Sequence, residues 1–113
     1  MDDDISFREA LAGLLHSFGY SIATFESGPD FLVSDRRYTT ACLILDIQMP
    51  RMSGLDLQAK LVEQGQATPV IFVTSRADVH TLSRAMDAGA IAVLCKPFDH
   101  GQLLTYVRMA VGG

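Results

Sequence analysis

The sequence contains no long apolar run and few basic residues. Asp, Arg or Gly interrupts each apolar stretch after a few residues, so we predict no membrane-spanning helix. No apolar stretch follows a basic N-terminus, which argues against a secretion signal and leads us to expect a cytoplasmic protein. Nine Lys and Arg against thirteen Asp and Glu give a formal charge of −4. Because nucleic-acid affinity needs clustered cations, we expect no direct binding of nucleic acid by this chain.

Cysteine is also scarce. The two thiols, Cys42 and Cys95, lie inside apolar runs, without the spacing of a zinc site or a disulfide framework. A free cysteine in such a run is usually buried, so we expect both to be core residues. The three histidines, His16, His80 and His100, are scattered without metal-ligand spacing, and we expect them on the surface.

Along the sequence, segments with the apolar spacing of helices alternate with segments typical of strands. The chain has 113 residues, 49% of them apolar, which is enough for one domain. Apolar spacing predicts helices over residues 5–18, 53–63, 78–88 and 99–111, and one further helix that Ser27 caps and that contains Phe31, Leu32 and Val33. Alternating apolar residues predict a short strand over residues 20–25, and apolar runs predict strands over residues 41–45, 69–73 and 90–94. Buried strands joined by helices indicate an α/β fold with a doubly wound parallel sheet.

Polar residues follow directly after three of these strands. Asp46 follows the first of the three, Thr74 and Ser75 follow the next, and Lys96 follows the last. Ligands bind beyond the carboxyl ends of the strands in such sheets, so a carboxylate, a hydroxyl and an ammonium should meet there. Each residue alone is ordinary, because a lone Asp or Thr usually forms a turn and Lys usually faces water. Together they suit phosphoryl transfer, whose catalysis depends on positioning and charge neutralisation.

Four motifs stand in order along the chain. They are Asp2-Asp3-Asp4 before the first helix; Leu43 to Pro50 followed by Met52-Ser53-Gly54; Val73-Thr74-Ser75; and Ala88-Gly89-Ala90 leading to Lys96-Pro97-Phe98. Together they resemble the receiver domain of two-component response regulators, of the subtype that often precedes a DNA-binding domain. The resemblance extends from Asp2 to about Val111. It implies a flavodoxin-like receiver fold, with residues 1–113 forming one phosphoacceptor domain.

The resemblance implies a role for each residue at the strand ends. Asp46 would accept a phosphoryl group from a sensor histidine kinase or a phosphotransfer protein. Thr74 would hydrogen-bond one phosphoryl oxygen, and Lys96 would pair with another. Phosphorylation would move Thr74 and the loop after it, shifting the face of helix 78–88 that regulates an output such as transcription. A second copy of the chain is a candidate partner, and a membrane is not.

The resemblance also implies a Mg²⁺ cofactor. Asp3 would bind the ion directly and Asp2 would bind it through water. Asp46 and the backbone carbonyl of Gln48 would be further ligands. Mg²⁺ prefers hard oxygen ligands of this kind and usually keeps some of its waters.

The chain departs from the family pattern at both ends and at one switch position. Only Met1 precedes the acids, where the family has an apolar first strand, so we expect four strands and a truncated N-terminus. No effector domain follows, so we expect the domain to be separated from one. Val93 replaces the aromatic switch residue that the family usually carries. We predict that coupling from Asp46 to helix 78–88 is weaker here, or runs through Thr74 and its loop alone.

Two alternatives stay open. An inactive receiver would act as a phosphate-independent interaction or dimerisation module, and the missing strand favours it. A Mg²⁺-dependent aspartyl phosphatase would share the chemistry but would need a general acid where Gln48 stands. Because a carboxamide cannot donate that proton, we expect no enzyme beyond self-catalysed phosphotransfer and dephosphorylation.

Large side chains on the first and last helices have two interpretations. Phe7 is expected in the core, with contact to the kinase through Phe7 or Ala10 as the alternative. Tyr106 and Met109 are expected to pack against the sheet, with contact to a second copy as the alternative. Helices beside a sheet bury one face, so packing is the more common arrangement.

Overall fold

The computed structural model describes residues 5–20, 32, 41–47, 53–65, 68–75, 78–96 and 99–111. The elements in these ranges alternate between helix and strand. They are α1 (Ile5–Ser17), β1 (Leu43–Asp46), α3 (Gly54–Glu63), β2 (Val70–Thr74), α4 (Val79–Asp87), β3 (Ala92–Cys95) and α5 (His100–Ala110). None of these helices combines the length and the apolar character needed to cross a membrane.

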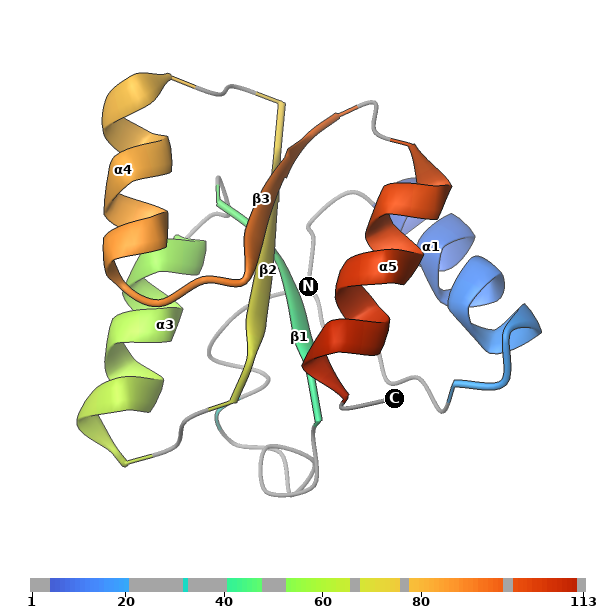
Figure 1. Ribbon diagram of the computed structural model, residues 1–113, viewed down its shortest axis with the longest axis horizontal. Helices are drawn as coiled ribbons and strands as arrows, with labels where there is room; N and C mark the ends of the chain where they lie inside the picture. The colour runs from blue at the N-terminus through green and yellow to red at the C-terminus, as the bar shows by residue number, and fades with distance from the viewer. Residues whose placement is uncertain are drawn as a thin grey trace.

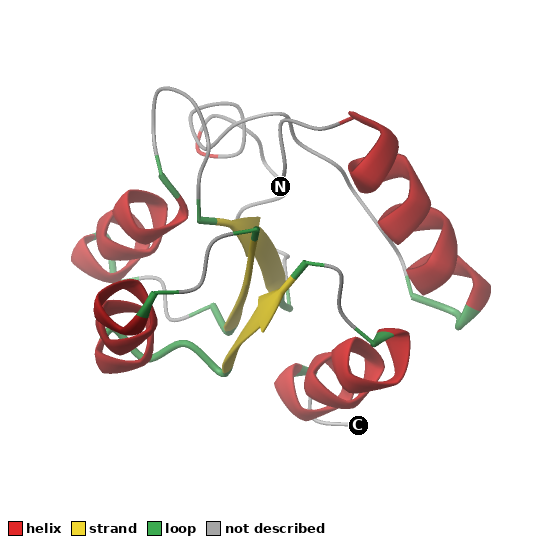
Figure 2. Cartoon of the chain, turned by 90° about the horizontal axis from the view of Figure 1, so that it is seen from above, coloured by secondary structure: helices red, strands yellow, loops and turns green. Residues whose placement is uncertain are grey.

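The three strands form a parallel sheet in the order β1-β2-β3. Helices cover both faces of this sheet. In Figure 1, α3 and α4 lie on one side of the strands and α1 and α5 lie on the other, and the view from above in Figure 2 shows the same separation. The doubly wound parallel sheet that the sequence predicts is therefore confirmed.

Two apolar clusters fill the space between the helices and the sheet. The α3–α4 core contains the buried residues Leu43, Leu45, Ile47, Leu57, Leu61, Val70, Phe72, Ala85 and Ala90. The α1–α5 core contains Leu15, Ile71, Val73, Leu94, Leu103 and Val107. β2 contributes alternate residues to the two cores because successive side chains of a strand point to opposite faces. All five residues of β2 are buried, as expected of a central strand covered on both sides.

Polar caps begin three of the helices. Ser53 and Asp56 form a reciprocal capping box at the start of α3. Asp78 caps α4 by accepting a hydrogen bond from the Thr81 backbone at 2.8 Å, and this contact lowers the pKa of the Asp78 carboxyl. Asp99 caps α5. Gly19 lies just beyond the C-terminal end of α1 with a φ of 89°. Glycine suits this position because it adopts a positive φ more readily than other residues do.

The structure corrects several of the sequence-based predictions. Strand β1 begins two residues later than predicted, at Leu43. The three strands end at Asp46, Thr74 and Cys95, each one residue later than predicted. The predicted strand over residues 20–25 lies outside the described residues, so the expected count of four strands is not tested. In the predicted helix after Ser27, only Leu32 is described; it is helical and packs against the α3–α4 core.

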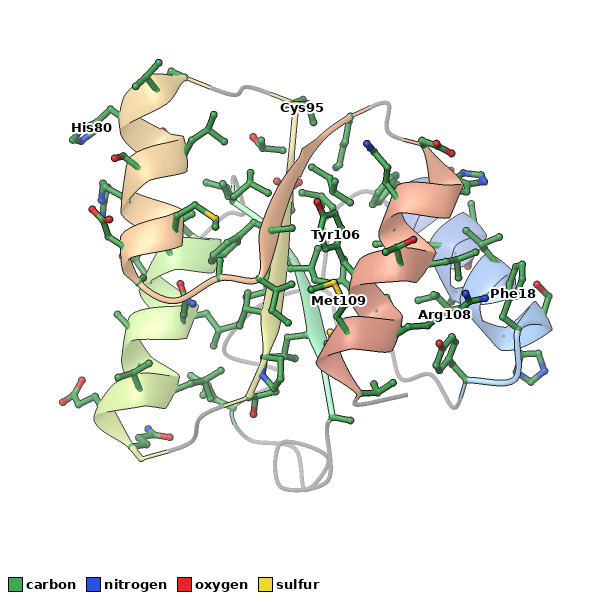
Figure 3. All side chains as sticks on the ribbon, viewed as in Figure 1. Phe18, His80, Cys95, Tyr106, Arg108 and Met109 are labelled. Carbon is green, nitrogen blue, oxygen red and sulfur yellow. The ribbon has the colours of Figure 1, made fainter. Side chains whose placement is uncertain are left out.

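Three apolar side chains are exposed, and for two of them, Cys95 and Met109, the sequence predicts burial. Cys95 is exposed at the end of β3, and Met109 of α5 is 64% exposed (both are labelled in Figure 3). Val62, at the end of α3, is 61% exposed. Each is the last or the second-last residue of its element. The histidines predicted on the surface are all exposed: His16, His80 and His100.

Candidate functional site

The strand register places the predicted site residues at one edge of the sheet. Asp46 ends β1 and lies opposite Val73, one residue before Thr74. Thr74 ends β2 and lies opposite Cys95, one residue before Lys96. Because the strands are parallel, their carboxyl ends meet, and each site residue is one step further along its strand than its neighbour.

Asp46 and Lys96 form an ion pair. The Lys96 Nζ donates a hydrogen bond to Oδ2 of Asp46 at 3.2 Å. The Asp46 side chain is 8% exposed and that of Lys96 is 20% exposed. A carboxylate removed this far from water needs a compensating charge, and the ammonium supplies it. The pair therefore presents a shielded oxygen nucleophile beside a cation.

Thr74 lies next to this pair but on the other face of the sheet. The alternation of β2 places Thr74 on the face of Phe72, toward the α3–α4 core, whereas Asp46 shares the face of Ile44, toward the α1–α5 core. Thr74 is completely buried. Its backbone carbonyl accepts a hydrogen bond from the Lys96 backbone N–H at 2.7 Å, which fixes the end of β3 against the end of β2.

The start of α3 packs tightly on the backbone of Asp46. A Cβ placed on Gly54 would lie 2.6 Å from the Asp46 carbonyl oxygen and 3.0 Å from the Phe72 ring. The Gly54 N–H donates to the carbonyl of Ile47 at 3.1 Å. Only glycine permits this approach, and it fixes the chain on both sides of the segment that carries the carboxylate.

The ring of Phe7 covers the ammonium of Lys96. The Lys96 Nζ lies 4.1 Å from the Phe7 ring centroid, within the range of a cation–π contact. Phe7 is half-buried and also packs against the α1–α5 core, as the sequence predicts. The contact with Lys96 is not predicted by the sequence, because no local pattern relates the first turn of one helix to a residue that follows a distant strand.

Part of the predicted magnesium site lies outside the described residues. This applies to Asp2, Asp3 and Gln48, whereas Asp46 is described. The buried carboxylate of Asp46 is a hard oxygen donor and fits the ligand preference of Mg²⁺. No group of three or more His, Cys, Asp or Glu side chains that could hold a metal occurs in the ranges described above.

The chain matches known proteins along almost its whole length. The family model of the response regulator receiver domain matches residues 1–108. Response regulator protein TodT of Pseudomonas putida is 41% identical over 111 residues, which cover 98% of this chain and 49% of TodT. Transcriptional regulatory protein FixJ of Azorhizobium caulinodans is 37% identical over 112 residues, which cover 99% of this chain and 53% of FixJ. The chain thus spans about half the length of these curated relatives.

A solved structure of the response regulator StyR superimposes with a TM-score of 0.91 at 40% identity, covering 99% of this chain and 57% of that one. The flavodoxin-like receiver fold implied by the sequence motifs is thereby confirmed. The family match, the relatives and the fold agree, and the chain belongs to the family of response regulator receiver domains.

Proposed function

We propose that Asp46 is the phosphoacceptor of this receiver domain and that a sensor histidine kinase or a phosphotransfer protein is the donor. The observation that carries the proposal is the ion pair between the buried Asp46 carboxylate and the Lys96 ammonium, 3.2 Å apart at the carboxyl edge of the sheet. Thr74 ends the neighbouring strand and supplies a hydroxyl at the same edge.

The proposed step is an in-line displacement at phosphorus. An Asp46 carboxylate oxygen attacks the phosphorus of a phosphohistidine, so that a P–O bond forms while the P–N bond breaks. The electron pair of that bond leaves with the histidine imidazole, and the product is an acyl phosphate. The Lys96 ammonium, already beside Asp46, pairs with one phosphoryl oxygen, and the Thr74 hydroxyl donates to another. The acyl phosphate carries about 1.5 to 2 negative charges at this edge, in place of the single charge of the carboxylate.

Mg²⁺ is the proposed cofactor. Asp46, Asp3 and the backbone carbonyl of Gln48 would hold the ion, with Asp2 acting through water. The bound ion would supply further positive charge for the phosphoryl oxygens. The residues of the chain would perform the positioning, because the Lys96 Nζ lies 3.2 Å from Oδ2 of Asp46.

We also propose that residues 1–113 act as the receiver of a larger regulator whose output is transcription. This proposal rests on the relatives, which are about twice as long as the chain and include a transcriptional regulatory protein. The signal would reach the output through the face of α4, and the protein would act in the cytoplasm. DNA contacts would come from another domain, because this chain is acidic.

Labelling with acetyl phosphate and Mg²⁺ tests the phosphoacceptor. We expect the intact mass of the wild type to increase by one phosphoryl group, and we expect base to remove it. Asp46→Asn should gain nothing, while Asp56→Asn, at an exposed carboxylate of α3, should gain as much as the wild type. Labelling of Asp46→Asn would refute the assignment.

The same experiment separates the alternatives. An inactive receiver would gain no mass and would not change its spectrum with Mg²⁺ and beryllofluoride. A phosphatase would hydrolyse a small phosphate ester continuously rather than acquire one label per chain. Either result would overturn the proposed function.

A further inference from the structure

The aromatic ring above Lys96 is not part of the phosphoryl chemistry described so far. Phe7 lies in the first turn of α1, and its ring centroid is 4.1 Å from the Lys96 Nζ. The same nitrogen is 3.2 Å from Oδ2 of Asp46. The ammonium is therefore in contact with an aromatic face and with the carboxylate at once.

We propose that Phe7 is a positioning residue for phosphorylation: its ring holds the Lys96 ammonium beside Asp46 before the phosphoryl group arrives. This inference rests on the proposed function of Asp46. It adds α1 to the elements that determine the reactivity of the site, since Asp46, Thr74 and Lys96 come from the strand ends.

The chemistry of Lys96 and Phe7 explains why the ring would improve the positioning of the ammonium. A lysine ammonium is a strongly hydrated charge on a flexible four-carbon stem, so it has many positions away from the site. An aromatic face attracts the cation and excludes water from one side of it. The Lys96 side chain is only 20% exposed, which strengthens this attraction.

An aromatic ring also suits this position better than a polar group would. A second carboxylate near Lys96 would neutralise its charge and compete with the phosphoryl oxygens for its N–H donors. The Phe7 ring attracts the charge through its π face and accepts no conventional hydrogen bond. It can therefore restrain the ammonium while leaving its positive charge available to the incoming group.

NMR tests the contact directly. The chain has two lysines, Lys96 and the exposed Lys60 of α3, so selective ¹³C-lysine labelling gives one site signal and one internal reference. We expect ring-current shielding to move the ε-methylene protons of Lys96 upfield of those of Lys60. The upfield shift should vanish in Phe7→Leu and persist in Phe7→Tyr. An unshifted Lys96 in the wild type would overturn the inference.

The rate of labelling by acetyl phosphate tests the consequence. We expect Phe7→Leu to slow labelling by about two- to fivefold, the factor that corresponds to a partly exposed cation–π contact. Phe7→Tyr should restore the rate, because tyrosine keeps the aromatic face. Phe18→Leu makes the same replacement at an exposed ring beyond the far end of α1 (Figure 3), and it should leave both readouts unchanged.

Controls separate positioning from folding and from the proposed function itself. Rates are compared well below the thermal unfolding midpoint of each variant, and Phe7→Met replaces Phe7→Leu if the latter does not fold. Equal rates for the wild type and a folded aliphatic variant would overturn the inference, even with the NMR shift present. Absence of label on the wild type would refute the phosphoacceptor proposal instead, and the NMR shift would then decide alone whether the ring holds the ammonium.

Discussion

At the scale of single residues, the two cysteines have opposite surroundings. Cys42 precedes β1, is half-buried, and its Sγ–H donates to the Leu43 carbonyl at 3.8 Å. Burial raises the pKa of the Cys42 thiol to about 11, because the thiolate would lose its hydration. Cys95, at the end of β3, is exposed. Each follows an apolar residue in the sequence, and the apolar run that contains each thiol does not reveal its exposure.

A thiol reagent at pH 8 should therefore distinguish Cys42 from Cys95. We expect one thiol per native chain to react rapidly and the second to react only after unfolding, since the thiolate is the reactive form and Cys42 remains protonated. A colorimetric titration with and without denaturant measures this. Cys95→Ser should abolish the rapid phase, and rapid reaction of both thiols in the native chain would contradict the prediction.

The raised pKa of Cys42 also has a consequence for stability. The folded chain favours the neutral thiol, so the contribution to stability is complete below the ordinary pKa of 9.0 and is lost as the pH rises toward about 11. We expect the free energy of unfolding to fall more steeply between pH 9 and pH 11 for the wild type than for Cys42→Ala. Denaturant titrations at several pH values provide the comparison, and parallel curves would refute it.

At the scale of elements, the junction of β1 and α3 depends on Gly54. In Gly54→Ala the new methyl group would meet the Asp46 carbonyl, which belongs to the backbone and cannot move aside cheaply. We expect the free energy of unfolding to fall by about 1–3 kcal/mol, as overpacking usually costs. Gly13→Ala, within α1 and with nothing within 4 Å of the new Cβ, should instead gain about 0.5–1 kcal/mol. Urea denaturation of both variants measures the contrast; a Gly54→Ala chain as stable as the wild type would refute it.

The sequence predicts the elements better than it predicts their margins. Helices α3, α4 and α5 begin one residue after their predicted starts at Ser53, Asp78 and Asp99, because these residues cap the helices and capping is a local interaction. The position at which β1 begins is decided by its partner, since the Leu43 N–H donates to the Pro69 carbonyl of another segment. The exposure of Val62 likewise depends on tertiary packing. The spacing of apolar residues along α3 does not reveal it.

The same distinction applies to the site. The convergence of Asp46 and Lys96 follows from a rule about parallel sheets that needs only the strand assignments. The contact between Phe7 and Lys96 depends on the height and angle at which α1 packs on the sheet. Those quantities are set by tertiary packing, so the aromatic neighbour of the lysine could be recognised only in the structure.

At the scale of the whole molecule, Val93 affects how a signal would leave the site. Val93 lies opposite Phe72 in the register, is half-buried, and packs against the α3–α4 core that includes Ala85 of α4. A valine cannot move between buried and exposed positions as an aromatic ring can. We therefore expect phosphorylation to change the α4 face only weakly.

Val93→Phe should restore that coupling. We expect beryllofluoride with Mg²⁺ to strengthen self-association of Val93→Phe by about fivefold or more relative to its effect on the wild type, which is the lower end of typical coupling energies. Sedimentation equilibrium provides the measurement. Val62→Phe places the same ring on the exposed end of α3 and should behave as the wild type does. Unchanged association of Val93→Phe would show that the residue does not limit the coupling.

At the carboxyl edge of the sheet, Thr74 and the Asp46–Lys96 ion pair belong to opposite faces, and this arrangement bears on how such a molecule can evolve. The α1–α5 core packs on the face to which Asp46 belongs, and the α3–α4 core packs on the face to which Thr74 belongs. Inherited changes in one pair of helices can therefore adjust how fast phosphate is captured, and changes in the other pair can adjust how capture is reported. The speed of the switch and the strength of its response can then be selected through different helices.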